Sequence, residues 1–481
     1  MKDWKETLGR RVLDPETRDR WITVTWMILT MAMLLHHIWV TVHFAVPENG
    51  SLALRFPWVL LAGISFFLGR MWKDRGWWVL MALLAVKILR VAIPMPGALS
   101  DSQSVFELCL YAFGICYAVG RVLCEKDRER FIDWFCGLWT AAMTVYACFG
   151  LYTVWNNAVI PNLGNMTFYV RYAVRLWPIY HPTDAGTLTG VSIAAALVGF
   201  FRTRNKWIRG LYIPAIFLIL LMGVFTASRT HLVLTALGTG AAVCLVLNEK
   251  LRKTGKPGKG AAALRIAGTC VAFAAITLGM ILLQQQVIPV YNAIRIRGAG
   301  LLSAAMAEEV TATPEPLMML TREFGGIGGG ANGFLTGRVM IWKSVFAVMG
   351  EEPWRWLWGQ SVYKVMGPVN EYLATQGMTD FIYHTHSAFI QTLWESGIPG
   401  LLLFTGFFGI FAWSGIRLTL DSGAPLWQRL LPLPAALCLL ADMIDCTGYC
   451  NWGKPPMTIL YLFAGLTVAV WTERKRKGGR V

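Results

Sequence analysis

Residues 384–400 read HTHSAFIQTLWESGIPG, and they join a long polar segment to a long apolar one. Upstream, residues 285–383 form by far the longest stretch of the chain that reads as non-membrane. Downstream, apolar residues continue to about residue 416. A run of that length predicts a helix that crosses a membrane, which takes about 20 residues. The fold therefore depends on how many such runs the rest of the chain contains.

The composition is that of a membrane protein. Of 481 residues, 55% are hydrophobic and 15% are charged, whereas an average soluble domain carries about 25% charged residues. The mean hydropathy is +0.49, and long apolar runs recur from one end of the chain to the other. The sequence therefore predicts an all-α fold, a polytopic helical membrane protein.

The apolar runs predict about twelve transmembrane helices, over residues 21–46, 52–69, 77–93, 104–122, 131–155, 185–201, 207–227, 231–247, 261–284, 387–416, 430–444 and 455–471. They divide the chain into a basic N-terminal segment (1–20), nine helices (21–284), an external loop with short amphipathic helices (285–385), three helices (386–471) and a basic tail (472–481). An even number of spans agrees with two basic ends on the same side of the membrane.

The formal net charge of +16 is concentrated in short loops between apolar runs. This distribution follows the positive-inside rule, which places both termini in the cytoplasm and residues 285–385 outside. The basic residues are thus topology signals, and no nucleic-acid partner is predicted. The first apolar run is too long for the core of a cleavable signal peptide.

Neither a metal site nor a nucleotide site is predicted. Most of the ten cysteines lie in apolar runs, where they are small core residues. Cys446 and Cys450 share a short loop, as free thiols or as a disulfide. The glycine-rich residues 325–330 lack the Gly-Lys-Ser/Thr ending of a phosphate-binding loop.

The histidine pair is the first candidate for chemistry. If a helix starts near Thr385, His386 lies in its first turn, where the helix N-terminus and nearby arginines disfavour the imidazolium. A neutral imidazole can take a proton from a hydroxyl group. The alternative is an interfacial histidine bonded to a backbone carbonyl. His384 and His386, two residues apart on a helix, would not converge on one metal ion.

Downstream, Gln391 and Glu395 fall on one polar stripe of the same helix. A bend in that helix is expected at 397–399, which reads Gly-Ile-Pro.

Arginines supply the other candidates. Arg229 stands in a tight external turn between two spans, either as a phosphate clamp or as an interfacial anchor. Arg338 opens an amphipathic segment, 337–350, that is expected to lie on the bilayer surface. Trp342 follows one turn later; Arg338 would contact an anion while Trp342 stacks on a sugar or anchors in the interface. An ordinary amphipathic helix is the alternative.

Two further arginines, Arg171 and Arg175, lie in the external loop 156–183, against the positive-inside rule. They are weaker candidates, and simple solvation would also account for them.

Three stretches resemble the O-antigen ligase and polymerase superfamily. They are the Ser-Arg at 228–229, the Gly-Arg…Trp at 337–342, and the histidine signature that runs from His386 to Gly400. A looser match is Arg175 followed by His181-Pro182-Thr183, where the superfamily has Asn-Pro-Asn. The resemblance covers residues 175–403, and its motifs stand in the expected order on the predicted external side.

The resemblance implies a metal-independent, cofactor-free glycosyltransferase in the bacterial inner membrane. Its donor would be a glycan on polyprenyl diphosphate, and its acceptor a hydroxyl of a glycan, lipid or protein. His386 would be the base, with inversion at the sugar, and Arg229 and Arg338 would contact the diphosphate. The expected substrate-binding residues are Arg171, Arg175, Trp342, His384 and Glu395. Glu395 would not touch His386 directly, because nine residues of helix span about 13 Å.

Two questions stay open. A ligase and a polymerase would share these residues, and the absence of an acceptor-recognition motif favours a polymerase or a broad glycan transferase slightly. A lipid-linked glycan flippase without catalysis is the alternative class; it would predict internal repeats and broken helices in mid-membrane, and the sequence has no visible repeat.

Overall fold

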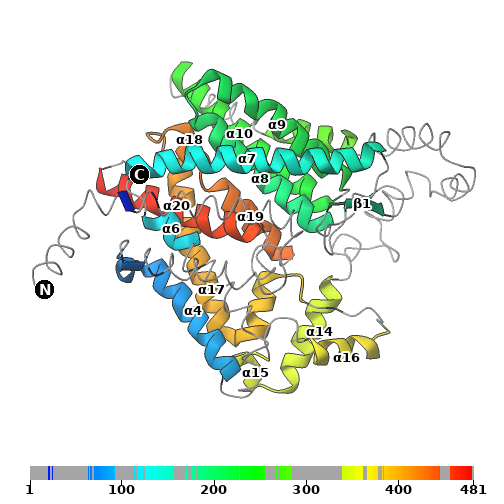
Figure 1. The fold of residues 1–481 in the computed structure, drawn as a ribbon. Helices are drawn as coiled ribbons and strands as arrows, with labels where there is room; N and C mark the ends of the chain where they lie inside the picture. Colours follow the sequence, from blue (N-terminus) through cyan, green and yellow to red (C-terminus); the bar gives the residue numbers. More distant parts are fainter. Residues whose placement is uncertain are drawn as a thin grey trace, which may run out of the picture.

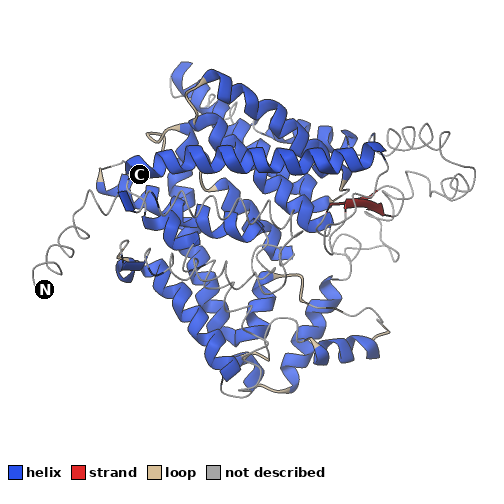
Figure 2. Ribbon diagram, viewed as in Figure 1, coloured by secondary structure: helices blue, strands red, loops and turns tan. Residues whose placement is uncertain are grey.

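We describe the protein from a computed structural model. It describes residues 20–21, 24, 63, 66–67, 70–92, 113, 116–122, 125–156, 168–171, 175–178, 182–226, 228–254, 267–268, 270–283, 286, 338–360, 366–377, 382, 384–444 and 455–478. Within these ranges helices predominate (Figure 2), and the strands are β1 (Phe168–Arg171) and β2 (Arg175–Pro178).

The named helices, in chain order, are η1 (Met71–Lys73), α4 (Arg75–Ala92), α6 (Ala118–Val122), α7 (Glu125–Asn156), α8 (Pro182–Arg202), α9 (Lys206–Phe225), α10 (Arg229–Thr254), α14 (Arg338–Glu351), α15 (Trp354–Trp358), α16 (Gly367–Thr375), α17 (Ala388–Leu420), α18 (Leu426–Leu430), α19 (Leu433–Ile444) and α20 (Pro455–Arg476). A shorter apolar helix covers Cys270–Leu283.

The protein is an all-α, multi-pass membrane protein. Six of the described helices are long and apolar enough to cross a bilayer: α7, α8, α9, α10, α17 and α20. They coincide with six predicted spans, and α4 and α19 occupy two more. Nearly all of the first two spans, most of the fourth and the loop with Cys446 and Cys450 lie outside the described residues. The number of twelve therefore stays a prediction.

Two helices form the centre of the bundle. In α8 and α20, 83% of the most apolar 18-residue window is buried, against 33% in α9. Small residues permit this packing, because backbones in a membrane approach closely only where side chains are small. A Cβ on Gly120 of α6 would lie 2.4 Å from the carbonyl oxygen of Leu462 in α20, and one on Gly465 would lie 2.4 Å from that of Tyr117.

Ion pairs connect the loops and helix ends that are predicted to lie on the same face of the membrane. Arg121 contacts Asp74 at 2.6 Å, and Arg128 contacts Glu473 at 2.6 Å. The pairs Arg202–Glu129 (2.9 Å) and Arg474–Asp421 (2.6 Å) follow the same pattern. Each pair joins two loops or helix ends that alternation places on the same side. The relative sidedness of these spans is therefore consistent, while the cytoplasmic assignment of this face rests on the positive-inside rule.

The expectation that residues 337–350 lie on the bilayer surface is wrong for the apolar face of that helix. In α14, Ile341, Val345 and Val348 are buried in a separate small core with residues of α16 and with Trp394 of α17. The helices α14, α15 and α16 lie together beside the start of α17, away from α9 and α10 (Figure 1). The apolar stripe that suggested a lipid contact is covered by protein.

A hairpin stands where the sequence suggested only a loop. Strands β1 and β2 are antiparallel, with Arg171 opposite Arg175 and Phe168 opposite Pro178. The hairpin lies beside the first turn of α8, on the side of the molecule opposite to the C-terminus (Figure 1). Both predicted external arginines thus belong to one two-stranded element.

Candidate functional site

The histidine segment, residues 384–387, directly precedes α17. The helix begins at Ala388, and the N-cap is Ser387, whose backbone is extended (φ −152°, ψ 122°). The expectation that His386 lies in the first helical turn is therefore wrong. His386 precedes the cap and has a left-handed backbone, φ 53°. This conformation is uncommon for residues other than glycine, but histidine is among the residues that tolerate it best.

Two side chains hold the backbone of Thr385, the residue before His386. The indole N–H of Trp342 donates to the Thr385 carbonyl oxygen at 2.8 Å, and the Thr385 N–H donates to Gln391 Oε1 at 2.9 Å. The Thr385 hydroxyl donates to the carbonyl of Ser387 at 2.9 Å. Thr385 is completely buried, whereas His386 is half-buried. The side chain of His386, whose own backbone is strained, therefore follows a residue whose backbone is held in place.

The two histidines lie against each other. The His386 N–H donates to Nδ1 of His384 at 3.2 Å, and the ring centroids are 4.2 Å apart. His384, whose role was open from the sequence, therefore closes the turn that orients His386. Within the described residues, no group of three His, Cys, Asp or Glu side chains is placed to hold a metal ion.

Glu395 is remote from His386 and connects to it through other groups. One carboxylate oxygen accepts from the amide of Gln391 at 2.9 Å, and the other accepts from the ammonium group of Lys87 in α4. Lys87 and Glu395 are both buried, with side chains 4% and 3% exposed. The polar stripe predicted for α17 is confirmed, but its partner on α4 was not foreseen. A lysine inside an apolar run was the available signal.

The bend in α17 is confirmed and lies at Gly397, whose φ is 63°. A Cβ there would lie 2.4 Å from the carbonyl oxygen of Leu357, and one on Gly359 would lie 2.6 Å from the backbone of Glu395. The N–H of Gln360 donates to the carbonyl of Trp394 at 2.6 Å. The two glycines therefore let α15 and the residues after it pack directly against the backbone at the bend.

The predicted catalytic arginines both open helices. Arg338 is the first residue of α14, one turn before Trp342, and its side chain is half-buried. Arg229 is the first residue of α10, and three residues separate it from the end of α9. The structure thus places Arg338 on the helix that supports the histidine segment. Arg229 belongs to a different group of helices, α8, α9 and α10.

His231 fixes the start of α10 against its neighbours. Its Nδ1 is hydrogen-bonded to the hydroxyl of Thr189 in α8 at 2.8 Å, and its ring is completely buried. A Cβ on Gly223 of α9 would lie 2.1 Å from this ring, and one on Gly186 of α8 would lie 2.4 Å from the hydroxyl of Ser228. Three helices therefore determine where the backbone of Arg229 stands.

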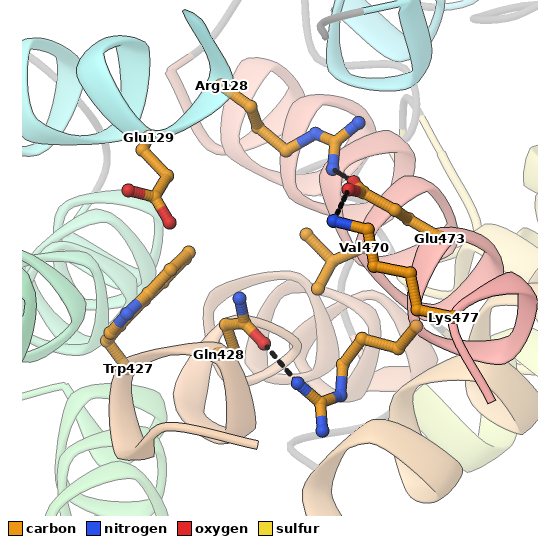
Figure 3. Close-up of a pocket in the computed structure, with 8 residues that line it drawn as sticks. Arg128, Glu129, Trp427, Gln428, Val470, Glu473 and Lys477 are labelled. Carbon is orange, nitrogen blue, oxygen red and sulfur yellow. Dashed lines mark hydrogen bonds and ion pairs between the residues drawn. The ribbon is translucent and has the colours of Figure 1, made fainter. Parts of the chain in front are cut away.

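A small pocket of about 60 Å³ lies between the start of α7, the helix α18 and the end of α20 (Figure 3). Most of its polar side chains pair with one another. Arg128 and Lys477 contact the two carboxylate oxygens of Glu473, at 2.6 and 3.0 Å, and Arg474 donates to Gln428 at 3.4 Å. Trp427 and Val470 complete the wall. None of the predicted site residues lines it, so we assign it a structural role in joining α7, α18 and α20.

The chain matches a known protein family over a region that contains several of these features. Residues 214–405 match the family model described as O-antigen ligase. The matched range contains Arg229, Arg338, Trp342, His386 and Glu395. No curated protein matches the chain.

Proposed function

We propose that the chain is a member of the O-antigen ligase and polymerase superfamily, because residues 214–405 match the family model described as O-antigen ligase, and that it transfers a glycan from polyprenyl diphosphate to a sugar hydroxyl on the outer face of the bacterial inner membrane. The observation that carries the proposal is the placement of the three candidate catalytic residues. Arg229 and Arg338 open helices, and His386 stands two residues before a third. Helix N-termini and guanidinium groups both favour phosphate oxygens.

The reaction needs a base and a stabilised leaving group. His386 takes the proton of the acceptor hydroxyl as its oxygen attacks the anomeric carbon. The bond between that carbon and the diphosphate oxygen breaks, and the configuration at the sugar inverts. Arg229 and Arg338 stabilise the charge that develops on the polyprenyl diphosphate, with Arg175 in support. Positive charge from arginine replaces magnesium in this scheme.

The remaining predicted residues shape the site. Trp342 bonds the carbonyl of Thr385, and His384 bonds the N–H of the same peptide group, that of His386. Glu395 supports the histidine segment through Gln391. Arg171 and Arg175, paired across the hairpin, provide positive charge that suits a diphosphate or an acidic glycan.

The test is glycan transfer by the purified protein in liposomes that contain lipid-linked oligosaccharide, run with and without a separate acceptor. A ladder of products without added acceptor identifies a polymerase, and a single acceptor-dependent product identifies a ligase. His386→Ala and Arg229→Ala are expected to abolish both. Movement of the lipid-linked glycan across the bilayer with no product would instead support the flippase alternative. Full activity of His386→Ala would remove the proposed base.

A further inference from the structure

The buried ion pair between Lys87 and Glu395 is the most unusual charged contact near the histidine segment. Lys87 lies in α4, an apolar helix that packs along α17, and Glu395 lies one turn beyond Gln391. Burying two charges gains little stability, because the cost of desolvation offsets the attraction between them. A charged pair at this depth therefore calls for an explanation other than stability.

The pair determines which way the amide of Gln391 points. An ionised carboxylate only accepts hydrogen bonds, so Gln391 must turn its NH₂ group toward Glu395. Its carbonyl oxygen then faces the N–H of Thr385. With the amide reversed, an NH₂ group would meet an N–H, and the bond to Thr385 would be lost. The charge on Glu395 thus determines which group donates and which accepts in the hydrogen bonds from Glu395 through Gln391 to Thr385.

We propose that Lys87 is a positioning residue for His386: its ion pair with Glu395 holds in place the carboxylate that orients the Gln391 amide, and so holds the Thr385–His386 backbone. This inference rests on the proposed role of His386 as the base. A second cation of α4 supports it. Arg90, one turn after Lys87, donates to the carbonyl oxygens of Gly359 and Gln360, at 3.2 and 2.6 Å. The helix α4 thereby contacts both α17 and the residues that follow α15.

Removal of either charge has a defined consequence. In Lys87→Met, the carboxylate of Glu395 is buried without the cation that holds it in place. The carboxylate is then free to turn away from Gln391, so the Gln391 amide is no longer fixed. In Glu395→Gln, the ammonium group of Lys87 loses its carboxylate. We expect kcat to fall about 10²-fold in each, the loss that follows a displacement of about 1 Å at a catalytic group, with KM little changed.

A matched control exists on the same helix. Asp421, just past the other end of α17, is also a buried carboxylate in an ion pair, with Arg474 at 2.6 Å. Asp421→Asn removes a comparable charge but has no path to His386 through the contacts described above. It is expected to retain its kcat.

A double substitution separates positioning from folding. In Gln391→Glu with Glu395→Gln, residue 391 accepts from the Thr385 N–H and from the new amide at 395. That amide then offers its oxygen to Lys87. The order of donors and acceptors is restored, so the double variant should recover about tenfold in kcat over Glu395→Gln alone, since part of the 10²-fold loss comes from the lost order.

The experiment measures kcat and KM for these variants, together with the rate at which diethyl pyrocarbonate modifies His386, read by mass spectrometry. The proposal expects Lys87→Met and Glu395→Gln to change both kcat and the modification rate, and Asp421→Asn to change neither. If a single variant does not fold, the double substitution Lys87→Met with Glu395→Gln, which leaves no buried charge, takes its place. It leaves an amide at 395 that can donate or accept, so the same loss of order at Gln391 and the same changes are expected.

Unchanged kcat and modification rate in folded charge variants would overturn the proposal, as would failure of the swapped pair to recover. The modification rate does not depend on catalysis. If His386→Ala stays active while Lys87→Met alters the modification rate, the proposed base is wrong and the positioning network stands.

Discussion

The two ends of α17 solve the same problem, a buried carboxylate, in different ways. At one end Asp421 pairs with Arg474 and accepts from the N–H of Gly423, so its contacts remain local and join two helix ends. At the other end Glu395 pairs with Lys87 and passes its orientation through Gln391 to Thr385. The Asp421 contacts stabilise the packing of the helix bundle. The Glu395 contacts extend to the residue before His386, which is strained and half-buried. Burial of charge alone therefore does not distinguish a structural site from a functional one; the groups that follow it do.

The largest effect is expected from His386→Asn. Asparagine tolerates the left-handed conformation of residue 386 but cannot take the proton from the acceptor. The rate of glycan transfer should fall about 10³-fold, within the range for loss of a general base. The measurement is the initial rate of product formation with saturating donor. The thermal unfolding midpoint should match that of the wild type, and a variant with normal folding and normal activity would contradict the role of His386.

The second largest effect is expected from Arg338→Ala. Its kcat/KM should fall about 10²-fold, as expected when one charged donor to a developing anion is removed. Arg338→Lys should recover only part, because an ammonium group cannot form the forked contact. The matched control is Arg474→Ala at the other end of α17, which breaks a structural ion pair. Equal losses for the two alanine variants would mean that Arg338 has no special part in transfer.

The sequence was informative where chemistry follows a pattern along the chain. Apolar runs predicted the helical class, and the Gly-x-Pro sequence at 397–399 predicted the bend, both of which the structure confirms. The motif order made Arg229, Arg338 and His386 candidates, and their roles stay a prediction. A lysine in an apolar run, Lys87, was visible but had no partner within reach along the sequence. The partner is 308 residues away on α17, and only packing of α4 on α17 brings the two together.

The errors have the same origin. The left-handed backbone of His386 lies beside Thr385, whose carbonyl accepts from Trp342 and whose N–H donates to Gln391, and no local propensity encodes these contacts. The helix 337–350 was expected on lipid because its apolar stripe has no visible cover in the sequence. That cover is supplied by α16 and Trp394. The sequence predicts only a loop where β1 and β2 lie, since two strands of four residues give little alternation to detect.

The bend near the histidine end can be tested separately from catalysis. Gly397→Ala places a Cβ at φ 63°, 2.4 Å from the carbonyl oxygen of Leu357. The combined backbone strain and overpacking should cost about 2 kcal/mol or more in the free energy of unfolding. Thermal unfolding in detergent measures it as a lowered midpoint. Gly406→Ala is the control on the same helix, because a Cβ there meets nothing within 4 Å. If both variants melt alike, the close contact at the bend is not stabilising.

The smallest effect is expected at Trp342, whose hydrogen bond to Thr385 lies at the histidine end of α17 and has no counterpart among the contacts described at the other end. Trp342→Phe keeps an aromatic ring but removes the N–H that donates to Thr385. Loss of one hydrogen bond to a backbone carbonyl costs about 1 kcal/mol, which corresponds to about fivefold in kcat if the bond orients the base. Trp358→Phe, at an indole that is 51% exposed, is the control for the general effect of replacing a tryptophan. A fivefold loss confined to Trp342→Phe places the indole N–H in the support of His386, and equal rates for the two variants would restrict that indole to packing.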